Sequence, residues 1–399
     1  MTDEKFPSPL LITGARVVRP HGVVGDAGIL VEDGRIAQRL TDESELPLTS
    51  QTLDLKGLTL FPGFIDVHIH GAVGVDVLAA GVDELQEVAR YLATQGVTAW
   101  LPTLVPAPDE EYGRAARVVG ELMRVQEDKQ TPPAARALGL HYEGPFVNSA
   151  QCGALRTAYF KVFDNPAQLN ALAMVKHESV THLITLAPEI EGGIELVGEL
   201  RRRGFVVSIG HTRAEVETLD AAFAAGARHM THFFNAMTPL HHRRPGPVGW
   251  GLMRDAVTCD IIADGVHADP LMLALALRCK TAERLVLISD AVAPAGLGDG
   301  EFQMWGETIT VTDRRTSNER GSIAGSVISL RDAVRMMLGL GVPEHEVAQM
   351  ASLNPARLLG IDDRCGSIEE GKRADLAALD DEGTVQLTLV GGRIAFDAR

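Results

Sequence analysis

Eight short apolar runs constrain the fold of this chain more than any other feature of its sequence. They lie at 64–69, 97–104, 135–142, 180–186, 205–210, 227–233, 257–263 and 284–289. Amphipathic stretches separate most of them, such as VDELQEVARYLATQG at 82–96, which ends in glycine as helices commonly do. Strands that are apolar on both faces and alternate with helices are typical of a parallel sheet covered by helices. Eight such units predict an α/β fold, a (β/α)8 TIM barrel.

The two ends of the chain have a different pattern from the middle. Three segments near the start read as short strands separated by turn signals, at 10–18, 28–38 and 53–63. The pair Asp33-Gly34 is a typical hairpin turn. Strand patterns return at 367–380 and 384–397. Because the termini of a domain tend to lie close together, we expect residues 1–62 and 367–399 to form one β-sandwich domain beside a catalytic barrel of residues 63–366.

Charge and cysteine usage exclude several classes of function. The 399 residues include 37 basic and 53 acidic side chains, a net charge of -16, which disfavours nucleic acid and anionic membranes as partners. The four cysteines are far apart and form no CxxC pair. The N-terminal stretch MTDEKFPSPL lacks the basic and apolar regions of an export signal. We therefore expect a cytoplasmic protein with no membrane partner.

Polar side chains follow six of the eight apolar runs, at the strand ends where a TIM barrel carries its reactive groups. The residues concerned are His68 and His70, Glu143, His211, His232, Asp264 with His267, and Asp290. Any one of these histidines alone could be a packing residue, but six strand ends of this kind are hard to obtain by chance. Imidazole and carboxylate without thiolate suit Zn, Fe, Mn or Co. The predicted ligands are His68, His70, Glu143, His211 and His232, enough for one divalent ion or two.

The remaining histidines receive structural or solvent-exposed interpretations. His182 and His229 lie inside or next to apolar runs, which favours packing roles. His141 lies two residues before Glu143 and so on the same face of its strand, which leaves support of a ligand and plain packing both open.

The motifs around these positions resemble the amidohydrolase superfamily over essentially the whole chain. PGFIDVHIHG at 62–71 is similar to its opening motif, and ASLNPARLLG with GSIEEGKRADLAALD at 351–360 and 366–380 to its closing one. Six further motifs resemble the branch that deacetylates N-acetylglucosamine 6-phosphate: LHYEGPFVN at 140–148, GHT at 210–212, THFFNAM at 231–237, DGVH at 264–267, SDA at 289–291 and AGS at 324–326. The stretch LITLAPE at 183–189 lacks the lysine expected of the hydantoinase and dihydroorotase branches.

This resemblance implies a metal-dependent hydrolase that releases acetate and glucosamine 6-phosphate. It implies that Glu143, His211 and His232 hold the main metal, most simply zinc, that His68 with His70 can hold a second ion, and that Asp290 is the catalytic acid and base. The implied substrate contacts are Asn235, Ala236, Arg243, His267, Ala154, Ile323, Ala324 and Gly325. Arg243 is expected to reach into the neighbouring subunit's site of a homodimer.

One departure and several alternatives stay open at this point. The chain has Leu155 where the family usually has a histidine that contacts the substrate, so the metal alone, or His241 or His242, would have to supply its role. The substrate could instead be N-acetylgalactosamine 6-phosphate or another N-acyl amine, and a non-catalytic sugar-phosphate-binding protein is the alternative from a different class. Asp290 could cap a following helix, and Arg243 could be a solvated loop charge.

Overall fold

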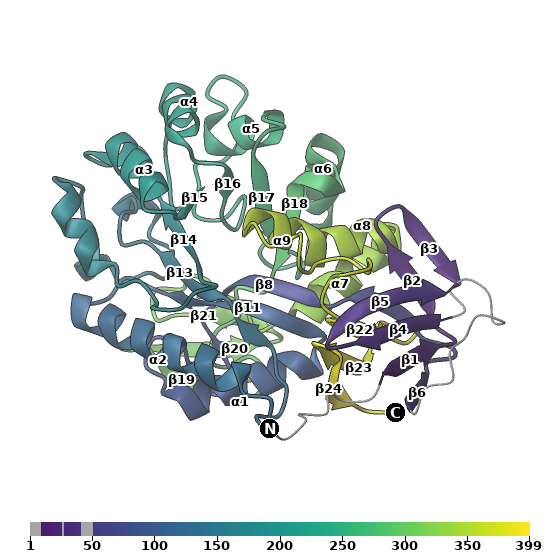
Figure 1. The fold of residues 1–399 in the computed structure, drawn as a ribbon. Helices are drawn as coiled ribbons and strands as arrows, with labels where there is room; N and C mark the ends of the chain where they lie inside the picture. Colours follow the sequence, from purple (N-terminus) through teal and green to yellow (C-terminus); the bar gives the residue numbers. More distant parts are fainter. Residues whose placement is uncertain (1–8, 26–27, 41–50) are drawn as a thin grey trace.

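The structure is a computed structural model that describes residues 9–25, 28–40 and 51–399 (Figure 1). Residues 1–8, which make up most of the segment considered for an export signal, lie outside the described residues. Among the helices that are described, none has the length and apolarity needed to cross a bilayer.

The centre of the fold is a parallel barrel whose eight strands coincide with the eight predicted apolar runs. The strands are β8 (Phe64–Ile69), β11 (Val97–Leu104), β13 (Gly139–Glu143), β14 (Thr181–Leu186), β15 (Val206–Ile209), β16 (His229–Met230), β17 (Thr258–Ile262) and β18 (Leu285–Ile288). Neighbouring strands pair in parallel from β8 through β11 and on to β18. The ring closes just past β18, where the Asp290 amide donates to the carbonyl of His68 at 2.9 Å and the His70 amide to that of Ala291 at 2.7 Å. The predicted fold class is confirmed.

Helices cover the outside of this barrel (Figure 1). In α1 the buried side chains Leu85, Val88 and Leu92 recur at helical spacing, so one face packs on the strands while Asp83 and Glu84 begin the first turn. The helices are α1 (Val82–Thr94), α2 (Asp109–Glu127), α3 (Gly193–Arg202), α4 (Val216–Ala225), α5 (Gly246–Met253), α6 (Pro270–Lys280), α7 (Leu330–Gly339), α8 (Glu344–Ala348), the π-helical turn η6 (Gln349–Leu353) and α9 (Asn354–Leu358). Short 3-10 turns lie at η2 (Ser149–Gln151), η3 (Thr157–Tyr159), η4 (Pro166–Ala171) and η5 (Ala282–Arg284).

Strands from both ends of the chain pack together beside the barrel, as the purple and yellow ribbons of Figure 1 show. One sheet has the order β5-β4-β1-β6 and the other β24-β23-β22-β7-β2-β3. The strands are β1 (Leu10–Thr13), β2 (Arg16–Arg19), β3 (Gly22–Gly25), β4 (Gly28–Glu32), β5 (Arg35–Leu40), β6 (Gln51–Asp54), β7 (Thr59–Pro62), β22 (Leu376–Leu379), β23 (Val385–Val390) and β24 (Arg393–Asp397). Asp33 and Gly34 form the predicted turn with φ of 50° and 74°. The two termini join where β7 pairs with β22, Leu60 opposite Ala378. The domain boundaries at 62/63 and 366/367 stay a prediction.

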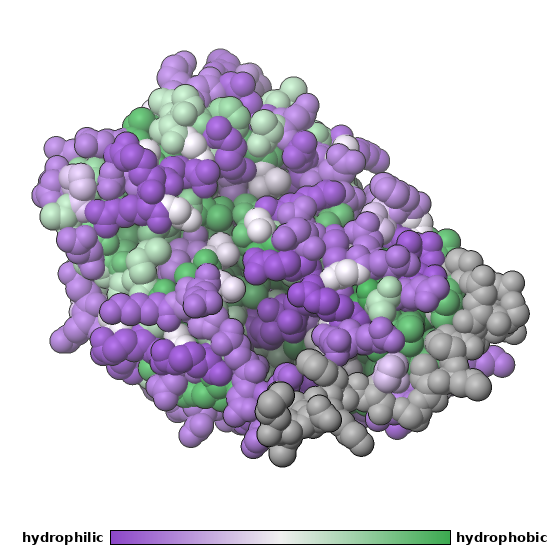
Figure 2. Space-filling model, viewed as in Figure 1, coloured by the Kyte–Doolittle hydropathy of each residue, from purple (hydrophilic) through white to green (hydrophobic). Residues whose placement is uncertain are grey.

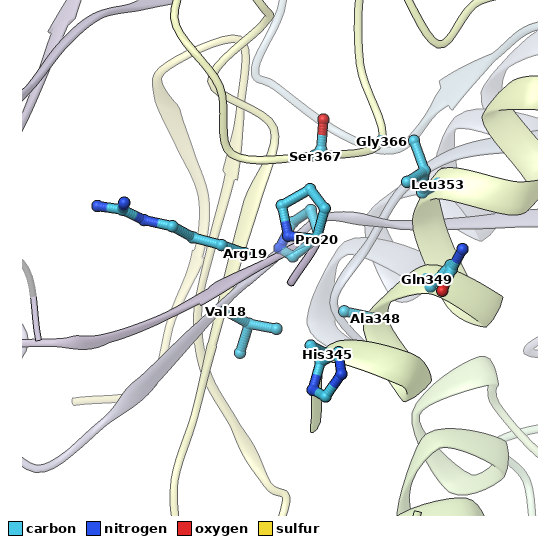
Figure 3. A pocket seen from close by; sticks show the side chains of 10 residues that line it. Val18, Arg19, Pro20, His345, Ala348, Gln349, Leu353, Gly366 and Ser367 are labelled. Carbon is cyan, nitrogen blue, oxygen red and sulfur yellow. The ribbon is translucent and has the colours of Figure 1, made fainter. Parts of the chain in front are cut away.

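The sandwich has its own apolar core and meets the barrel across a closely packed junction. Ile12, Ile36, Leu60 and Leu387 belong to that separate core. At the junction a cavity of about 10 Å³ remains between Pro20 of the sandwich side and Ala348 of α8 (Figure 3), room for about one water molecule.

Two elements were not predicted. A three-stranded antiparallel sheet, β19 (Gly300–Met304), β20 (Glu307–Thr312) and β21 (Arg315–Ser317), is inserted between β18 and α7. A two-stranded ribbon, β9 (Gly71–Ala72) with β10 (Val75–Asp76), follows β8. Both lie on the side of the barrel where the strands end, and the turn between β19 and β20 carries Trp305 to the mouth of the barrel. In Figure 2 polar residues cover most of the visible surface, and apolar residues are seen in its recesses and, in paler green, near the top and the left side.

Candidate metal centre and active site

The five predicted ligands come together at the C-terminal end of the barrel, around the carboxylate of Glu143. The Nε2 atoms of His211 and His232 lie 2.9 and 3.0 Å from Glu143 Oε1. On the other side, His70 Nε2 lies 3.2 Å from Glu143 Oε2 and 3.1 Å from His68 Nε2. Two compact groups result, His68 with His70 and Glu143, and Glu143 with His211 and His232, and every member is buried.

The tautomers of two of these histidines show that the cluster fits a cation. Nδ1 of His211 lies 2.7 Å from the carbonyl of Gln151, and Nδ1 of His70 lies 3.2 Å from the carbonyl of Thr103. A carbonyl only accepts, so each Nδ1 carries its hydrogen, and in the neutral imidazole each Nε2 turns a lone pair toward Glu143. Lone pairs and carboxylate oxygens about 3 Å apart repel one another unless positive charge lies between them. Nitrogen and oxygen donors in this number suit a divalent metal.

The charges of the site favour the same conclusion. Burial lowers the pKa of His70, but the carboxylates of Asp290 and Glu143 outweigh it and raise that pKa to about 10. Burial also lowers the pKa of His232, but the carboxylate of Glu143 outweighs it and raises that pKa to about 9. The field between the carboxylates therefore attracts positive charge, which protons and a divalent cation compete to supply.

Several site residues have a backbone conformation that is unfavourable for side chains other than glycine. The φ angles are 48° at His211, 33° at His232, 50° at Ala236 and 50° at Asp290. Each such residue costs on the order of 1–3 kcal/mol, and strain of this kind clusters at functional sites. Backbone bonds hold it in place, such as those of the Thr212 amide to the Ala236 carbonyl and of the Asn235 amide to the His232 carbonyl.

A layer of buried polar groups below the ligands was largely missed from the sequence. The Asp260 carboxylate accepts from the amide of His232 and lies 2.9 Å from Nε2 of His229. Asp66, two residues before His68, accepts from the hydroxyl of Ser289 at 2.5 Å. Burial raises the pKa of Asp66 to about 6, although the Ser289 bond opposes the rise. The period-two alternation of FIDVHI places Asp66 on the face of His68 and His70 and could have identified it.

His141 supports a predicted ligand. Its Nδ1 lies 3.0 Å from the carbonyl of Val67 and its Nε2 lies 2.8 Å from the hydroxyl of Thr185. Its ring packs edge-on against that of His68, with the centroids 4.5 Å apart. Because both of its ring nitrogens are hydrogen-bonded, the ring of His141 is fixed in place against that of His68, and neither nitrogen is free to bind an ion.

Asp290 lies at the edge of the cluster. Its Oδ1 is 3.4 Å from Nε2 of both His68 and His70. Burial raises the pKa of Asp290, but the charges of His68 and His70 outweigh it and keep that pKa below its usual value, so the group is a carboxylate at neutral pH. No described helix begins directly after Asp290, since the next one along the chain is α7, at Leu330, so the capping alternative is wrong.

A cavity of about 290 Å³ opens above the cluster. Most of the predicted substrate contacts line it: Ala154, Asn235, Ala236, His267, Ile323 and Gly325. Two do not, because Ala324 is fully buried between Ile323 and Gly325 in the chain and Arg243 is exposed, with Nη1 2.7 Å from His242 Nε2. The Nδ1 of His267 lies 2.7 Å from the Asp264 carboxylate, which sets the direction of its ring. Trp305 also lines the cavity, edge-on to His70, and was not predicted.

Leu155 forms part of the cavity wall and is only 4% exposed. His241 and His242 are exposed and stack on each other at 4.4 Å, and His241 lines a different cavity with Arg213 and Arg244. Within one chain, therefore, neither histidine takes the place that a side chain at 155 occupies.

Comparisons with known proteins agree with this geometry. The profile of the amidohydrolase family matches residues 59–395. The chain is 36% identical over 386 residues to an N-acetylgalactosamine-6-phosphate deacetylase of Escherichia coli O157:H7, covering 96% of this chain and 99% of that one. It is 33% identical over 394 residues to the N-acetylglucosamine-6-phosphate deacetylase of Bacillus subtilis, covering 97% of each. Its structure resembles that of a Mycobacterium smegmatis N-acetyl-D-glucosamine-6-phosphate deacetylase variant in complex with N-acetyl-D-glucosamine-6-phosphate, with a TM-score of 0.88, 28% identity and coverage of 98% and 100%.

Proposed function

The chain belongs to the amidohydrolase family, and on this premise we propose that it hydrolyses the acetamide of N-acetylglucosamine 6-phosphate, giving glucosamine 6-phosphate and acetate. The observation that carries the proposal is the arrangement of Asp290 beside the Glu143-centred cluster, at the floor of a cavity of about 290 Å³. The relatives that cover nearly the whole chain are named for this reaction or for that of the galactosamine epimer. A binding protein without activity would not need the cluster and Asp290 together.

Glu143, His211 and His232 would hold the main metal, and His68 with His70 a second ion. Zinc suits a set of ligands that consists of nitrogen and oxygen donors alone. Iron, manganese and cobalt also accept such a set. When bound there, a divalent metal would polarise the acetamide carbonyl and lower the pKa of water to about 7. The carbonyls of Gln151 and Thr103 keep the ligand nitrogens of His211 and His70 aimed at it.

Asp290 moves the proton in this scheme. As a carboxylate it takes a proton from the attacking water and then gives it to the departing amine, because an amine anion is too basic to leave unprotonated. Its position 3.4 Å from two ligand nitrogens keeps it next to the reacting centre. The left-handed backbone at Asp290 and the bond from its amide to His68 hold it there.

The cavity offers donors and apolar walls that suit a phosphorylated amino sugar. Nδ2 of Asn235 is buried and has no partner among the described residues, so it can donate to the sugar phosphate. His267, oriented by Asp264, presents its Nε2 to the cavity. Ala154, Leu155 and Trp305 line the cavity beside the cluster and suit the methyl of an acetyl group.

We assign Arg243 to the site of a second subunit in a homodimer. Arg243 is exposed and does not line the cavity of its own chain. Exposed apolar side chains follow in this part of the chain: Leu240, in the loop before α5, is 50% exposed, and Met253 of α5 and Leu271 of α6 are each 78% exposed. Exposed apolar residues grouped around a site often mark a protein interface. The four unpaired cysteines favour a reducing compartment, so we place the enzyme in the cytoplasm.

N-acetylgalactosamine 6-phosphate is the second candidate substrate. The relative named for it is 36% identical, which is at least as similar as the one named for the glucosamine epimer at 33%. The two sugars differ at one hydroxyl group, and a comparison of kcat/KM for the two epimers separates the candidates.

Acetate release from both epimers, with the metal content measured in the same samples, tests the proposal. We expect Asp290→Asn to lose at least about 10²-fold in kcat, the lower end of general acid–base assistance, while it keeps its metal. Asp381→Asn, an exposed aspartate in the loop between β22 and β23, is the matched control and should keep full activity. Normal turnover by Asp290→Asn would remove this residue from the mechanism. No acetate from either sugar with metal-loaded enzyme would overturn the proposed function.

A further inference from the structure

A second cavity lies at the opposite end of the barrel from the proposed active site. It has a volume of about 60 Å³, and its polar lining consists of Arg136, Arg364, Arg373, Ser179 and Thr181, with Cys365. Arg136 lies in β12 (Arg136–Ala137), and Thr181 is the first residue of β14, so the cavity is at the N-terminal ends of the barrel strands. Glu143, by contrast, is the last residue of β13.

Positive charge in this cavity exceeds the negative charge that faces it. Arg136 Nη2 and Arg373 Nε share one oxygen of the buried Asp375, at 2.9 and 3.2 Å. The other oxygen of Asp375 accepts from the amide of Gly391 at 2.7 Å. One carboxylate therefore balances one of two arginines, and Arg364 adds a third guanidinium.

The remaining groups do not supply the missing negative charge. Arg364 Nε is 3.6 Å from Asp363, whose side chain is 77% exposed and mostly screened by solvent. Burial raises the pKa of the Cys365 thiol to about 11, so the sulfur stays neutral at physiological pH. Burial, and the proximity of Arg136, lower the pKa of Arg373 although Asp375 opposes this, as expected where guanidinium groups crowd together.

One donor atom is also left without an acceptor. Nε of Arg136 is buried and has no partner among the described residues. A buried donor of this kind costs about 1–3 kcal/mol unless something accepts from it. The chain as a whole has a net charge of -16, but in this cavity three arginines surround one buried carboxylate. The local charge is therefore positive and favours the binding of an anion.

We propose that the cavity lined by Arg136, Arg364 and Arg373 binds a small tetrahedral oxyanion, inorganic phosphate or sulfate. Guanidinium groups bind such ions through paired N–H donors, and the hydroxyls of Ser179 and Thr181 add two more donors. A volume of about 60 Å³ suits an ion of five heavy atoms and not a sugar. The ion would link the starts of β13 and β14 to the segment that leads into β22, and so brace the barrel against the sandwich. This inference does not rest on the proposed function.

Calorimetric titration of the metal-loaded protein with inorganic phosphate, at constant ionic strength, tests the assignment. Arg364→Ala removes a guanidinium that does not bond Asp375, so the fold should be kept. We expect this variant to bind one phosphate fewer per chain than the wild type, or to bind at that site at least tenfold more weakly, with unchanged deacetylase activity. Arg202→Ala, whose side chain is 69% exposed on α3, is the matched control and should bind as the wild type does. A phosphate bound at the active site is present in all three proteins and cancels in the comparison.

Two further arms identify the ion. Sulfate should reproduce the difference between wild type and Arg364→Ala, and glucosamine 6-phosphate should not, because the sugar is too large for the cavity. Phosphate should also raise the melting temperature of the wild type more than that of the variant. Identical isotherms for the two proteins would overturn the proposal, as would an equal response to chloride or a difference that appears with the sugar phosphate alone.

Discussion

The buried histidine His182 makes the stability of this protein depend on pH, and its structural environment sets the size of the effect. His182 is the second residue of β14 and is 2% exposed. Its Nε2 accepts a hydrogen bond from the amide of Val175 at 3.0 Å, and its ring packs 5.5 Å from that of Phe205. Burial lowers its pKa from 6.5 to about 4. The folded protein therefore keeps His182 neutral where the unfolded chain would protonate it.

The sign and the magnitude follow from proton linkage. Between pH 6.5 and about 4 the unfolded state binds the extra proton, so the stabilisation is complete above pH 6.5 and is lost as the pH falls through this window. A difference of about 2.5 pKa units is worth about 3 kcal/mol in total, of which about 2 kcal/mol is already lost at pH 5. This is a large share of the 5–15 kcal/mol typical of a folded domain.

Urea unfolding at pH 7.5 and pH 5, followed by circular dichroism, measures this loss. In His182→Gln the side-chain oxygen can still accept from Val175 but cannot be protonated in this range. We expect the wild type to lose about 2 kcal/mol more than His182→Gln between the two pH values. His21→Gln, which removes an exposed imidazole, controls for the loss of a histidine as such. Equal losses in the wild type and His182→Gln would refute the reasoning.

Three further substitutions test the site. Glu143→Gln removes the carboxylate common to both groups of ligands, so we expect the bound metal, measured by elemental analysis, to fall at least tenfold. Glu191→Gln, at an exposed position, is the control. Full metal occupancy in Glu143→Gln would contradict the assignment. In Gly210→Ala the new Cβ would lie 2.6 Å from Thr185 Cγ2, so we expect a loss of about 1–3 kcal/mol in unfolding free energy together with weaker metal binding, whereas Gly339→Ala has open space and should be tolerated. An unchanged unfolding midpoint for Gly210→Ala would mean that the end of this strand accommodates the added methyl group more easily than its packing indicates. Arg243→Ala should raise KM at least tenfold for a phosphorylated sugar and leave kcat nearly unchanged, and an unchanged KM would show that Arg243 does not bind the phosphate.

The barrel could be predicted because its signal is local and repeated. Each of the eight barrel strands is a short apolar run, and the chain order of these strands is also their order around the barrel. Since every parallel strand ends at the same rim, the side chains that follow the runs were bound to meet there. This argument needed no distances, and it is why Glu143 and the four histidines were identified together.

Other features carried no such signal. Trp305 reaches the cavity on an inserted antiparallel sheet that the β/α pattern does not include. Asp260 supports His232 from a different strand, and in the sequence it is one more polar residue inside an apolar run. The three arginines that share the pocket at Asp375 lie far apart along the chain, at 136, 364 and 373.

By itself the sequence determined which strands form the barrel, which ends of them carry chemistry, and that both termini supply strands, because hydrophobic periodicity and strand order act locally along the chain. Only the tertiary structure decided which nitrogen of each histidine faces Glu143, that Asp290 lies equally far from His68 and His70, and that Arg243 does not line the cavity of its own chain. These facts depend on contacts between residues distant in sequence, whose directions and separations are set when the barrel closes and packs.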